Sequence, residues 1–187
     1  LGSEVLIVSS GAIAAGEQQL NLKSGQVEVS MRQVLAAVGQ SHLMQTYQSL
    51  FSVHSIPVAQ ALLTRRDLTN RVGYLNVRNT LLSLLELGVV PIVNENDVVA
   101  VEEIGEVFGD NDNLSSMVAN ILDADKLLIL SDISGLYTTD PHSDPDARLI
   151  PIVTRVDSNI EGMAGTTWSS TGRGGMATKL QAAKFAM

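Results

Sequence analysis

Four acidic or amide side chains stand in a row in the sequence VFGDNDNLSS: Asp110, Asn111, Asp112 and Asn113. The segment that follows them has helical composition. Asp and Asn satisfy the free N–H groups of a first helical turn, and one such cap is enough for a helix. The other side chains of the row are therefore candidates for chemistry, such as pairing with a cation or hydrogen-bonding a ligand.

Small and anionic side chains also follow three predicted strands. Ser10 and Gly11 follow the apolar residues 4–8, the sequence NEND (residues 94–97) follows the apolar residues 89–93, and Ser131–Asp132 closes KLLILSD. On spacing alone, Ser10–Gly11 is equally well explained as a tight turn or as a backbone N–H site for an anion at a helix start. In isolation, NEND is most simply an ordinary polar loop, but its place after an apolar strand favours a site.

A third candidate is GRGGMATK, residues 172–179, where glycines precede Lys179. Glycines adopt positive φ easily, so successive N–H groups can point at a phosphate. A lone glycine cluster is weak evidence, and no Gly-Lys-Ser/Thr sequence closes it as in a P-loop. The run Arg65–Arg66–Asp67 with Arg71 is interpreted as a solvated loop, with substrate or subunit contact as the alternative. The three histidines are scattered, which does not favour a histidine metal site.

Alternating strands and helices must position these residues. Apolar runs predict strands, and apolar residues at three- and four-residue steps predict helices. The predicted strands are 4–8, 56–63, 89–94 and 126–132, the predicted helices are 12–20, 29–53, 76–87, 114–122 and 178–187, and residues 98–108 are a candidate hairpin. This alternation predicts an α/β fold with a mostly parallel sheet covered by helices on both faces, whose ligands bind at the carboxyl ends of strands.

Composition excludes several classes of protein. The chain has 187 residues, 45% of them hydrophobic, and 12 basic against 20 acidic residues. A net charge of −8 without a basic run does not favour nucleic-acid binding. No cysteine occurs, which excludes disulfides and is compatible with a reducing, cytoplasmic setting. No apolar stretch approaches the roughly 20 residues that a membrane helix needs.

Five motifs in order resemble the signatures of the glutamate 5-kinase family, part of the amino acid kinase superfamily. They are VSSGAIAAG (8–16), VNENDVV (93–99), FGDNDNLS (108–115), LSDISGLYTTDP (130–141) and GRGGMATKLQAA (172–183). The resemblance covers nearly the whole chain. It implies a three-layer αβα sandwich and the reaction of ATP with L-glutamate to give ADP and γ-glutamyl phosphate, the first step of proline biosynthesis.

The resemblance also implies roles for single residues. Ser10, Asp97 and Asn111 would bind glutamate; Asp97 suits its α-ammonium, and the other two can hydrogen-bond carboxylate oxygens. Asp112 would orient a catalytic lysine by pairing with it, and Lys179 would stabilise the transferring phosphoryl group. The Gly11 N–H is a further candidate for that task, whereas Asp110 and Asn113 are expected to be caps or supporting residues.

On the nucleotide side, two segments match the ATP-contacting motifs of the family. The residues are Ser131, Asp132, Arg173, Gly174, Gly175, Met176, Ala177, Thr178 and Lys179. Mg²⁺ is expected to bridge the β- and γ-phosphates with few direct protein ligands, because it keeps water readily. No strong general base is needed, since the attacking γ-carboxylate of glutamate is already ionised at neutral pH.

Two departures from the family pattern stand out. Arg173 replaces the common Thr between glycines, and the Lys-containing strand expected at the N-terminus is missing. Residues 1–187 are therefore expected to form one kinase domain that lacks its first strand and the end of the domain beyond Met187, and this stretch alone is expected to have little activity.

Three functions remain open. They are a glutamate 5-kinase or the kinase half of a bifunctional pyrroline-5-carboxylate synthase, a sister kinase with another acyl acceptor, and a non-catalytic amino-acid-binding regulatory module. The resemblance adds two expectations about partners, namely feedback inhibition by proline and assembly as a homodimer or homotetramer.

Overall fold

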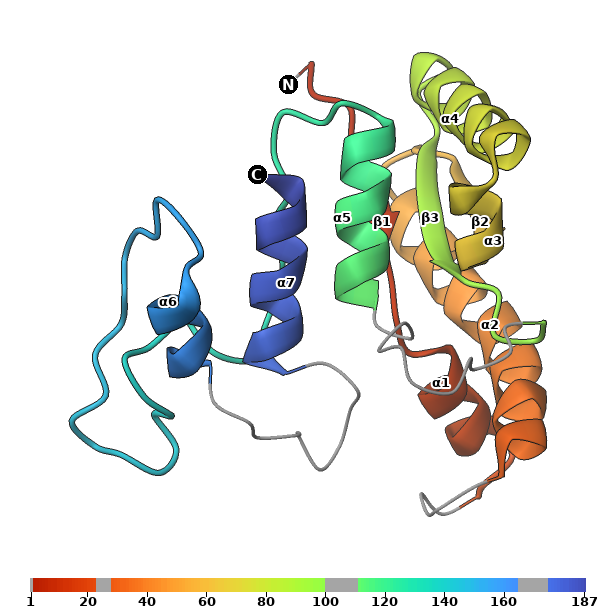
Figure 1. Cartoon of the computed structure of the whole chain (residues 1–187). Coiled ribbons are helices and arrows are strands. Elements are labelled where there is room, and N and C mark those ends of the chain that lie inside the picture. Colours follow the sequence, from red (N-terminus) through yellow and green to blue (C-terminus); the bar gives the residue numbers. More distant parts are fainter. Residues whose placement is uncertain (1, 23–27, 100–110, 165–174) are drawn as a thin grey trace. The chain divides into compact units, whose positions relative to one another are not determined.

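The computed structural model describes residues 2–22, 28–99, 111–164 and 175–187 of the chain (Figure 1). Two compact units are present, Leu1–Glu106 and Val107–Met187, and each is described by itself. The expected hairpin at residues 98–108 falls almost entirely outside the described residues. That the whole chain forms a single domain stays a prediction.

A parallel sheet of three strands, in the order β1-β3-β2, organises the first unit. The strands are β1 (Ile7–Val8), β2 (Val58–Leu63) and β3 (Val90–Glu95). Ile7 is in register with Ile92, and Val58 with Val90. β3 lies between the other two strands, and its residues Pro91 to Asn94 are buried, which explains the apolar run Pro91–Val93. The predicted α/β class with a parallel sheet is confirmed.

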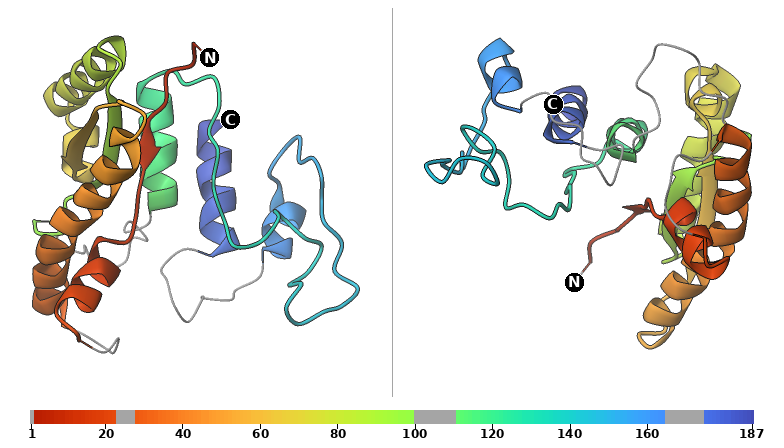
Figure 2. Two further views of the ribbon diagram at one scale, coloured as in Figure 1. Left: turned by 180° about the vertical axis from the view of Figure 1, so that it is seen from behind. Right: turned by 90° about the horizontal axis from the view of Figure 1, so that it is seen from below.

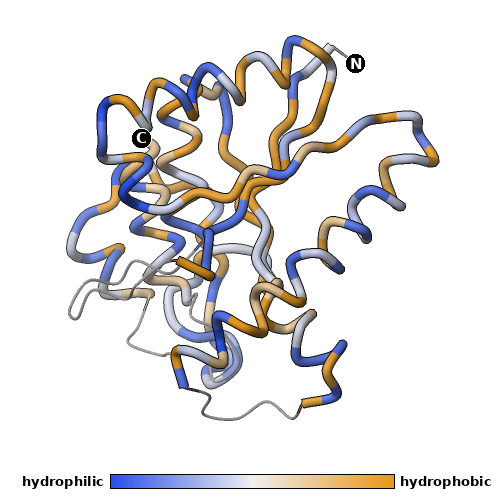
Figure 3. Tube along the Cα trace, turned by 90° about the vertical axis from the view of Figure 1, so that its right-hand side faces the viewer, coloured by the Kyte–Doolittle hydropathy of each residue, from blue (hydrophilic) through white to orange (hydrophobic). Residues whose placement is uncertain are grey.

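Helices α1 (Ala12–Gln19), α2 (Val29–Ser52), α3 (Arg65–Thr69) and α4 (Arg71–Glu86) complete this unit. α1 packs along α2, which contacts β2, while α4 contacts β3 (Figures 1 and 2). Polar and apolar residues are interleaved along the helical turns (Figure 3), as expected for helices that bury one side.

The contact between α1 and α2 is unusually close. A Cβ atom built on Gly39 of α2 would lie 1.8 Å from the backbone oxygen of Ala12, and one built on Gly16 of α1 would lie 2.1 Å from that of Leu35. No side chain larger than hydrogen fits at either position without separating the helices. These glycines therefore fix α1, and the turn that leads into it, against α2.

The prediction of a solvated loop around Arg65, Arg66 and Arg71 is wrong. Thr64 and Asp67 form a capping box that starts α3, and Asn70 caps the first turn of α4 by accepting a hydrogen bond from the N–H of Val72. Both caps are local sequence signals, because a Thr followed three residues later by an acidic residue satisfies the first N–H groups of a helix.

The second unit contains α5 (Asn111–Ile121), α6 (Ser158–Met163) and α7 (Met176–Ala186). α5 and α7 contact each other, and both helices carry buried apolar residues, among them Val118 and Ile121 on α5 and Leu180 on α7. The strand predicted at 126–132 is not formed: this segment is irregular, and Leu128 and Leu130 are 81% and 92% exposed. In the described part of this unit no strand lies beside it, and an apolar run without a neighbouring strand cannot build a ladder.

Candidate active site

The first group of candidate residues lies where β1 enters α1. The N–H of Ser9 donates to the carbonyl oxygen of Val93 at 2.9 Å, which continues the β1–β3 ladder by one residue. Ser10 and Gly11 are exposed, and Gly11 has φ 102° and ψ 0°. A Cβ on Gly11 would meet nothing within 4 Å, so this backbone conformation, and not lack of space, requires glycine. Within the described ranges no side chain caps α1, so its first N–H groups are suited to an anion, which is one of the two readings of the sequence.

The NEND residues lie at the same edge of the sheet, because β1 and β3 are parallel neighbours and both motifs follow their carboxyl ends. Asn94 is buried, donates to Oε1 of Gln40 at 2.9 Å and accepts from the N–H of Glu95 at 2.8 Å. The N–H of Asn96 donates to the carbonyl oxygen of Leu63 at 2.9 Å, which anchors the turn to β2. These contacts hold the backbone from which Asp97 projects.

Asp97 is half-buried, and this burial raises the pKa of its carboxyl above the usual range, while the nearby charge of Arg32 acts in the opposite direction. The cause is desolvation, which disfavours the charged form. A substrate ammonium beside Asp97 would lower this pKa again, so the residue is suited to bind a cation. Arg32, on the first turn of α2, was not among the residues expected at the site.

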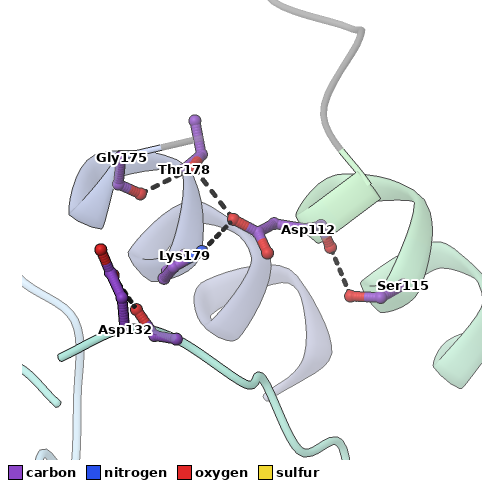
Figure 4. Close-up of polar contacts among 7 residues, drawn as sticks. Asp112, Ser115, Asp132, Gly175, Thr178 and Lys179 are labelled. Atoms are coloured by element: carbon purple, nitrogen blue, oxygen red, sulfur yellow. Dashed lines mark hydrogen bonds and ion pairs between the residues drawn. The ribbon is translucent and has the colours of Figure 1, made fainter. Parts of the chain in front are cut away.

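In the second unit, the carboxylate of Asp112 joins α5 to α7 (Figure 4). Its Oδ2 accepts hydrogen bonds from Nζ of Lys179 at 2.9 Å and from Oγ1 of Thr178 at 3.1 Å. The side chains of Lys179 and Asp112 are 21% and 15% exposed. The pairing that was expected between these two residues is therefore present, and it leaves the lysine partly accessible.

The other side chains of the acidic row are placed differently. Asn111 is half-buried at the start of α5, Asn113 is buried, and Ser116 Oγ donates to the carbonyl oxygen of Asn113 at 2.8 Å. Ser115 Oγ donates to the backbone oxygen of Asp112 at 2.6 Å (Figure 4). Asn113 is thus a buried residue of the first turn of α5, its expected role as a cap or supporting residue stays a prediction, and Asp110 lies outside the described residues.

The candidate nucleotide residues fall in two places of this unit. Ser131 and Asp132 are exposed on the irregular segment, where Ser131 Oγ donates to Oδ1 of Asp132 at 3.2 Å. Gly175 is the N-cap residue of α7 and offers no side-chain cap, so the N–H groups of Met176, Ala177 and Thr178 in the first turn can face an anion. The N–H of Lys179 donates to the carbonyl oxygen of Gly175 at 3.3 Å, so Lys179 can contribute only its side chain. Arg173 and Gly174 lie outside the described residues.

Three residues near the predicted site were missed by the sequence reasoning: Ser9, Gln40 and Tyr47. Tyr47 Oη donates to Ser9 Oγ at 2.8 Å across 38 residues of sequence, and Gln40 binds Asn94 across 54. No local pattern shows which partner a helical hydroxyl or amide reaches.

Each unit by itself offers groups suited to phosphate oxygens. In the first unit these are the Gly11 N–H and the uncapped start of α1, and in the second they are the Lys179 ammonium and the uncapped start of α7. Over the described ranges, no three His, Asp or Glu side chains gather closely enough to hold a metal ion.

The sequence matches the amino acid kinase family over residues 1–187, and the chain belongs to that family. Within it, similar relatives are glutamate 5-kinases. The enzyme of Dehalococcoides mccartyi is 59% identical over 187 residues, which are all of this chain and 50% of that protein. The enzyme of Herpetosiphon aurantiacus is 54% identical over 185 residues, which are 99% of this chain and 50% of that protein. The enzyme of Rhodospirillum rubrum is 52% identical over 186 residues, which are 100% of this chain and 49% of that protein.

The resemblance to glutamate 5-kinases is thus confirmed along the whole chain. The chain spans about half the length of these curated relatives. Among the residues that the structure describes, no helix combines the length and the hydropathy needed to span a bilayer.

Proposed function

We propose that this chain carries the kinase chemistry of a glutamate 5-kinase, transferring the γ-phosphoryl group of ATP to the γ-carboxylate of L-glutamate in the first step of proline biosynthesis. The observation that carries the proposal is the partly buried Asp112–Lys179 ion pair, in a chain that is 59% identical to a relative named glutamate 5-kinase. A cation held in one position is what a phosphoryl transfer needs, because the charge of the transferring group spreads over its equatorial oxygens.

Glutamate is assigned to Ser10, Asp97 and Asn111. The Asp97 carboxylate binds the α-ammonium, and its partial burial strengthens this contact because water competes less for the charge. The hydroxyl of Ser10 and the amide of Asn111 hydrogen-bond carboxylate oxygens. The γ-carboxylate then attacks the γ-phosphorus; an oxygen–phosphorus bond forms, the bond to the β-phosphate oxygen breaks, and ADP leaves with the electron pair.

ATP is assigned to Ser131, Asp132 and residues 173–179. Lys179 contacts the transferring phosphoryl group, Asp112 keeps the ammonium of Lys179 in place, and the Gly11 N–H donates to a phosphoryl oxygen. Mg²⁺ supplies charge neutralisation at the β- and γ-phosphates when it is bound with ATP.

The deciding experiment measures glutamate-dependent ADP release by the full-length gene product with Mg-ATP, with hydroxylamine present to trap the acyl phosphate as γ-glutamyl hydroxamate. Hydroxamate from glutamate, and none from aspartate or N-acetylglutamate, supports the proposal. Product from another acyl acceptor would instead identify a sister kinase. Binding of glutamate without ADP release would identify a regulatory module.

We also propose feedback inhibition by proline, assembly as a homodimer or homotetramer, and a cytoplasmic location, all on the basis of the family resemblance. Proline titration of the same assay tests the first, and activity unchanged at millimolar proline would remove it. The mass of the protein in solution tests the second.

A further inference from the structure

A chain of three hydroxyl and carbonyl groups runs from α2 to the turn that precedes α1. Tyr47 Oη donates to Ser9 Oγ at 2.8 Å, and Ser9 Oγ donates to the carbonyl oxygen of Ser10 at 3.0 Å. Ser9 is 8% exposed, and Tyr47 is half-buried. Hydrogen bonds arranged in series strengthen one another when little water reaches them, so the Ser10 carbonyl is held firmly.

The carbonyl of Ser10 belongs to the same peptide unit as the N–H of Gly11. In a planar trans peptide these two bonds point in opposite directions. Holding the carbonyl toward Ser9 therefore directs the Gly11 N–H away from Ser9. If this peptide rotated by half a turn, a carbonyl oxygen would replace the N–H at that position and would repel a phosphate.

Gly11 by itself cannot prevent that rotation. Its φ of 102° is open to glycine, but glycine adopts negative φ about as readily, and the space where a Cβ would stand is open to 4 Å. The orientation of the peptide must therefore be fixed from outside the residue. Among the described residues, the hydroxyl of Ser9 is the group that donates a hydrogen bond to the Ser10 carbonyl, and Tyr47 in turn donates to that hydroxyl.

We infer that Tyr47 and Ser9 are positioning residues for the phosphoryl transfer: together they hold the Ser10–Gly11 peptide so that the Gly11 N–H faces the transferring group. This inference rests on the proposed function, in which that N–H is a donor to a phosphoryl oxygen. Neither side chain needs to touch a substrate.

The test compares Tyr47→Phe, Ser9→Ala and the double variant of the full-length protein in the hydroxamate assay. One hydrogen bond lost from the chain is expected to lower kcat about fivefold to tenfold, with both KM values within about twofold, because the donor acts on the transition state. The double variant should be no slower than Ser9→Ala, since both changes break the same chain. Ser9→Thr keeps the hydroxyl and should restore most of the rate.

Tyr74→Phe is the matched control. Tyr74 lies in α4 of the same unit, is half-buried, and its hydroxyl makes no hydrogen bond to any residue that the structure describes. The control should keep the wild-type kcat. A Tyr47→Phe protein with wild-type kcat, or losses that multiply in the double variant, would overturn the inference.

A second readout does not depend on activity. In a crystal structure of the Tyr47→Phe protein, the Ser10–Gly11 peptide should be rotated or occupy two orientations. A single unchanged orientation would refute the positioning role even if the wild-type protein formed no hydroxamate. Failure of the proposed function is seen separately, as the absence of hydroxamate from the wild-type protein.

Discussion

Replacing Asp112 with Asn tests the role of the ion pair most directly. Asn keeps the shape of the side chain and can still accept a hydrogen bond from Lys179, but it removes the negative charge that now lies 2.9 Å from Nζ. The ammonium of Lys179 stays charged in this variant, so what is lost is its counter-charge. An exposed ion pair contributes about 0.2–1 kcal/mol, and loss of one partner of a fully buried pair costs about 3–5 kcal/mol. The partial exposure of both side chains places this pair between the two, and we expect a loss of about 1–2 kcal/mol.

This loss predicts that kcat falls about tenfold in Asp112→Asn. The KM values for glutamate and ATP should change less than about threefold, because the lysine acts mainly on the transition state. The assay is initial-rate ADP release at saturating substrates, with hydroxamate formation as the second readout. The melting temperature of the variant shows whether the fold is intact.

Glu161→Gln is the matched control for this change. It also breaks a lysine–carboxylate pair in the second unit, between Lys184 and Glu161 at 2.6 Å, but these side chains are 56% and 48% exposed. Exposed pairs contribute little, so both kcat and melting temperature should stay at wild-type values. The reasoning is refuted if Asp112→Asn keeps the wild-type kcat, or if Glu161→Gln loses as much.

Three further predictions follow from the same contacts. Lys179→Ala should lower kcat by about a hundredfold or more while changing the glutamate KM little, and a loss confined to KM would contradict the assignment. Burial raises the pKa of Asp97, and only the ionised form binds an ammonium, so the glutamate KM should rise as the pH falls through that pKa. Arg32→Gln removes a charge that lowers the pKa of Asp97, so in this variant the rise in KM should occur at higher pH in a profile of kcat/KM. An unchanged profile would show that Arg32 does not act on Asp97. Gly39→Ala forces a Cβ against the backbone of α1 and should lower the melting temperature by about 4–10 °C. The control Gly162→Ala places its Cβ in open space on α6 and should not lower the melting temperature. Equal melting temperatures of the two variants would show that the close contact between α1 and α2 does not contribute to stability.

The fold of the first unit was largely predictable from the sequence, because its signals are local. The long helix was predicted at 29–53 and observed as α2 at Val29–Ser52, and the buried strand predicted at 89–94 is β3 at Val90–Glu95. The caps at Thr64 and Asn70 were equally local, yet the neighbouring arginines led to an expectation of a loop. A run of arginines has the same composition on an exposed helix surface as in a loop, so only the helix caps distinguish the two structures in the sequence.

Elements that depend on distant partners were less predictable. The run at 126–132 has the composition of a buried strand, but a strand exists only when another strand lies beside it. The hydrogen bond from Tyr47 to Ser9 depends on how α2 lies against the end of β1, which periodicity does not specify. Asp112 and Lys179 were paired in advance only through the family resemblance, because 67 residues separate them.

That separation has a consequence for the newborn protein. All three strands of the sheet that the structure describes have been made once residue 95 is added, whereas Asp112 is made 67 residues ahead of Lys179. At about 5–20 residues per second, this interval lasts several seconds. During synthesis, the two turns that carry Ser10 and Asp97, after β1 and β3, can therefore form early, while Asp112 of α5 has no Lys179 to pair with until α7 has been made. The growing chain therefore contains Ser10 and Asp97, two of the three residues that we assign to glutamate, well before it contains Lys179.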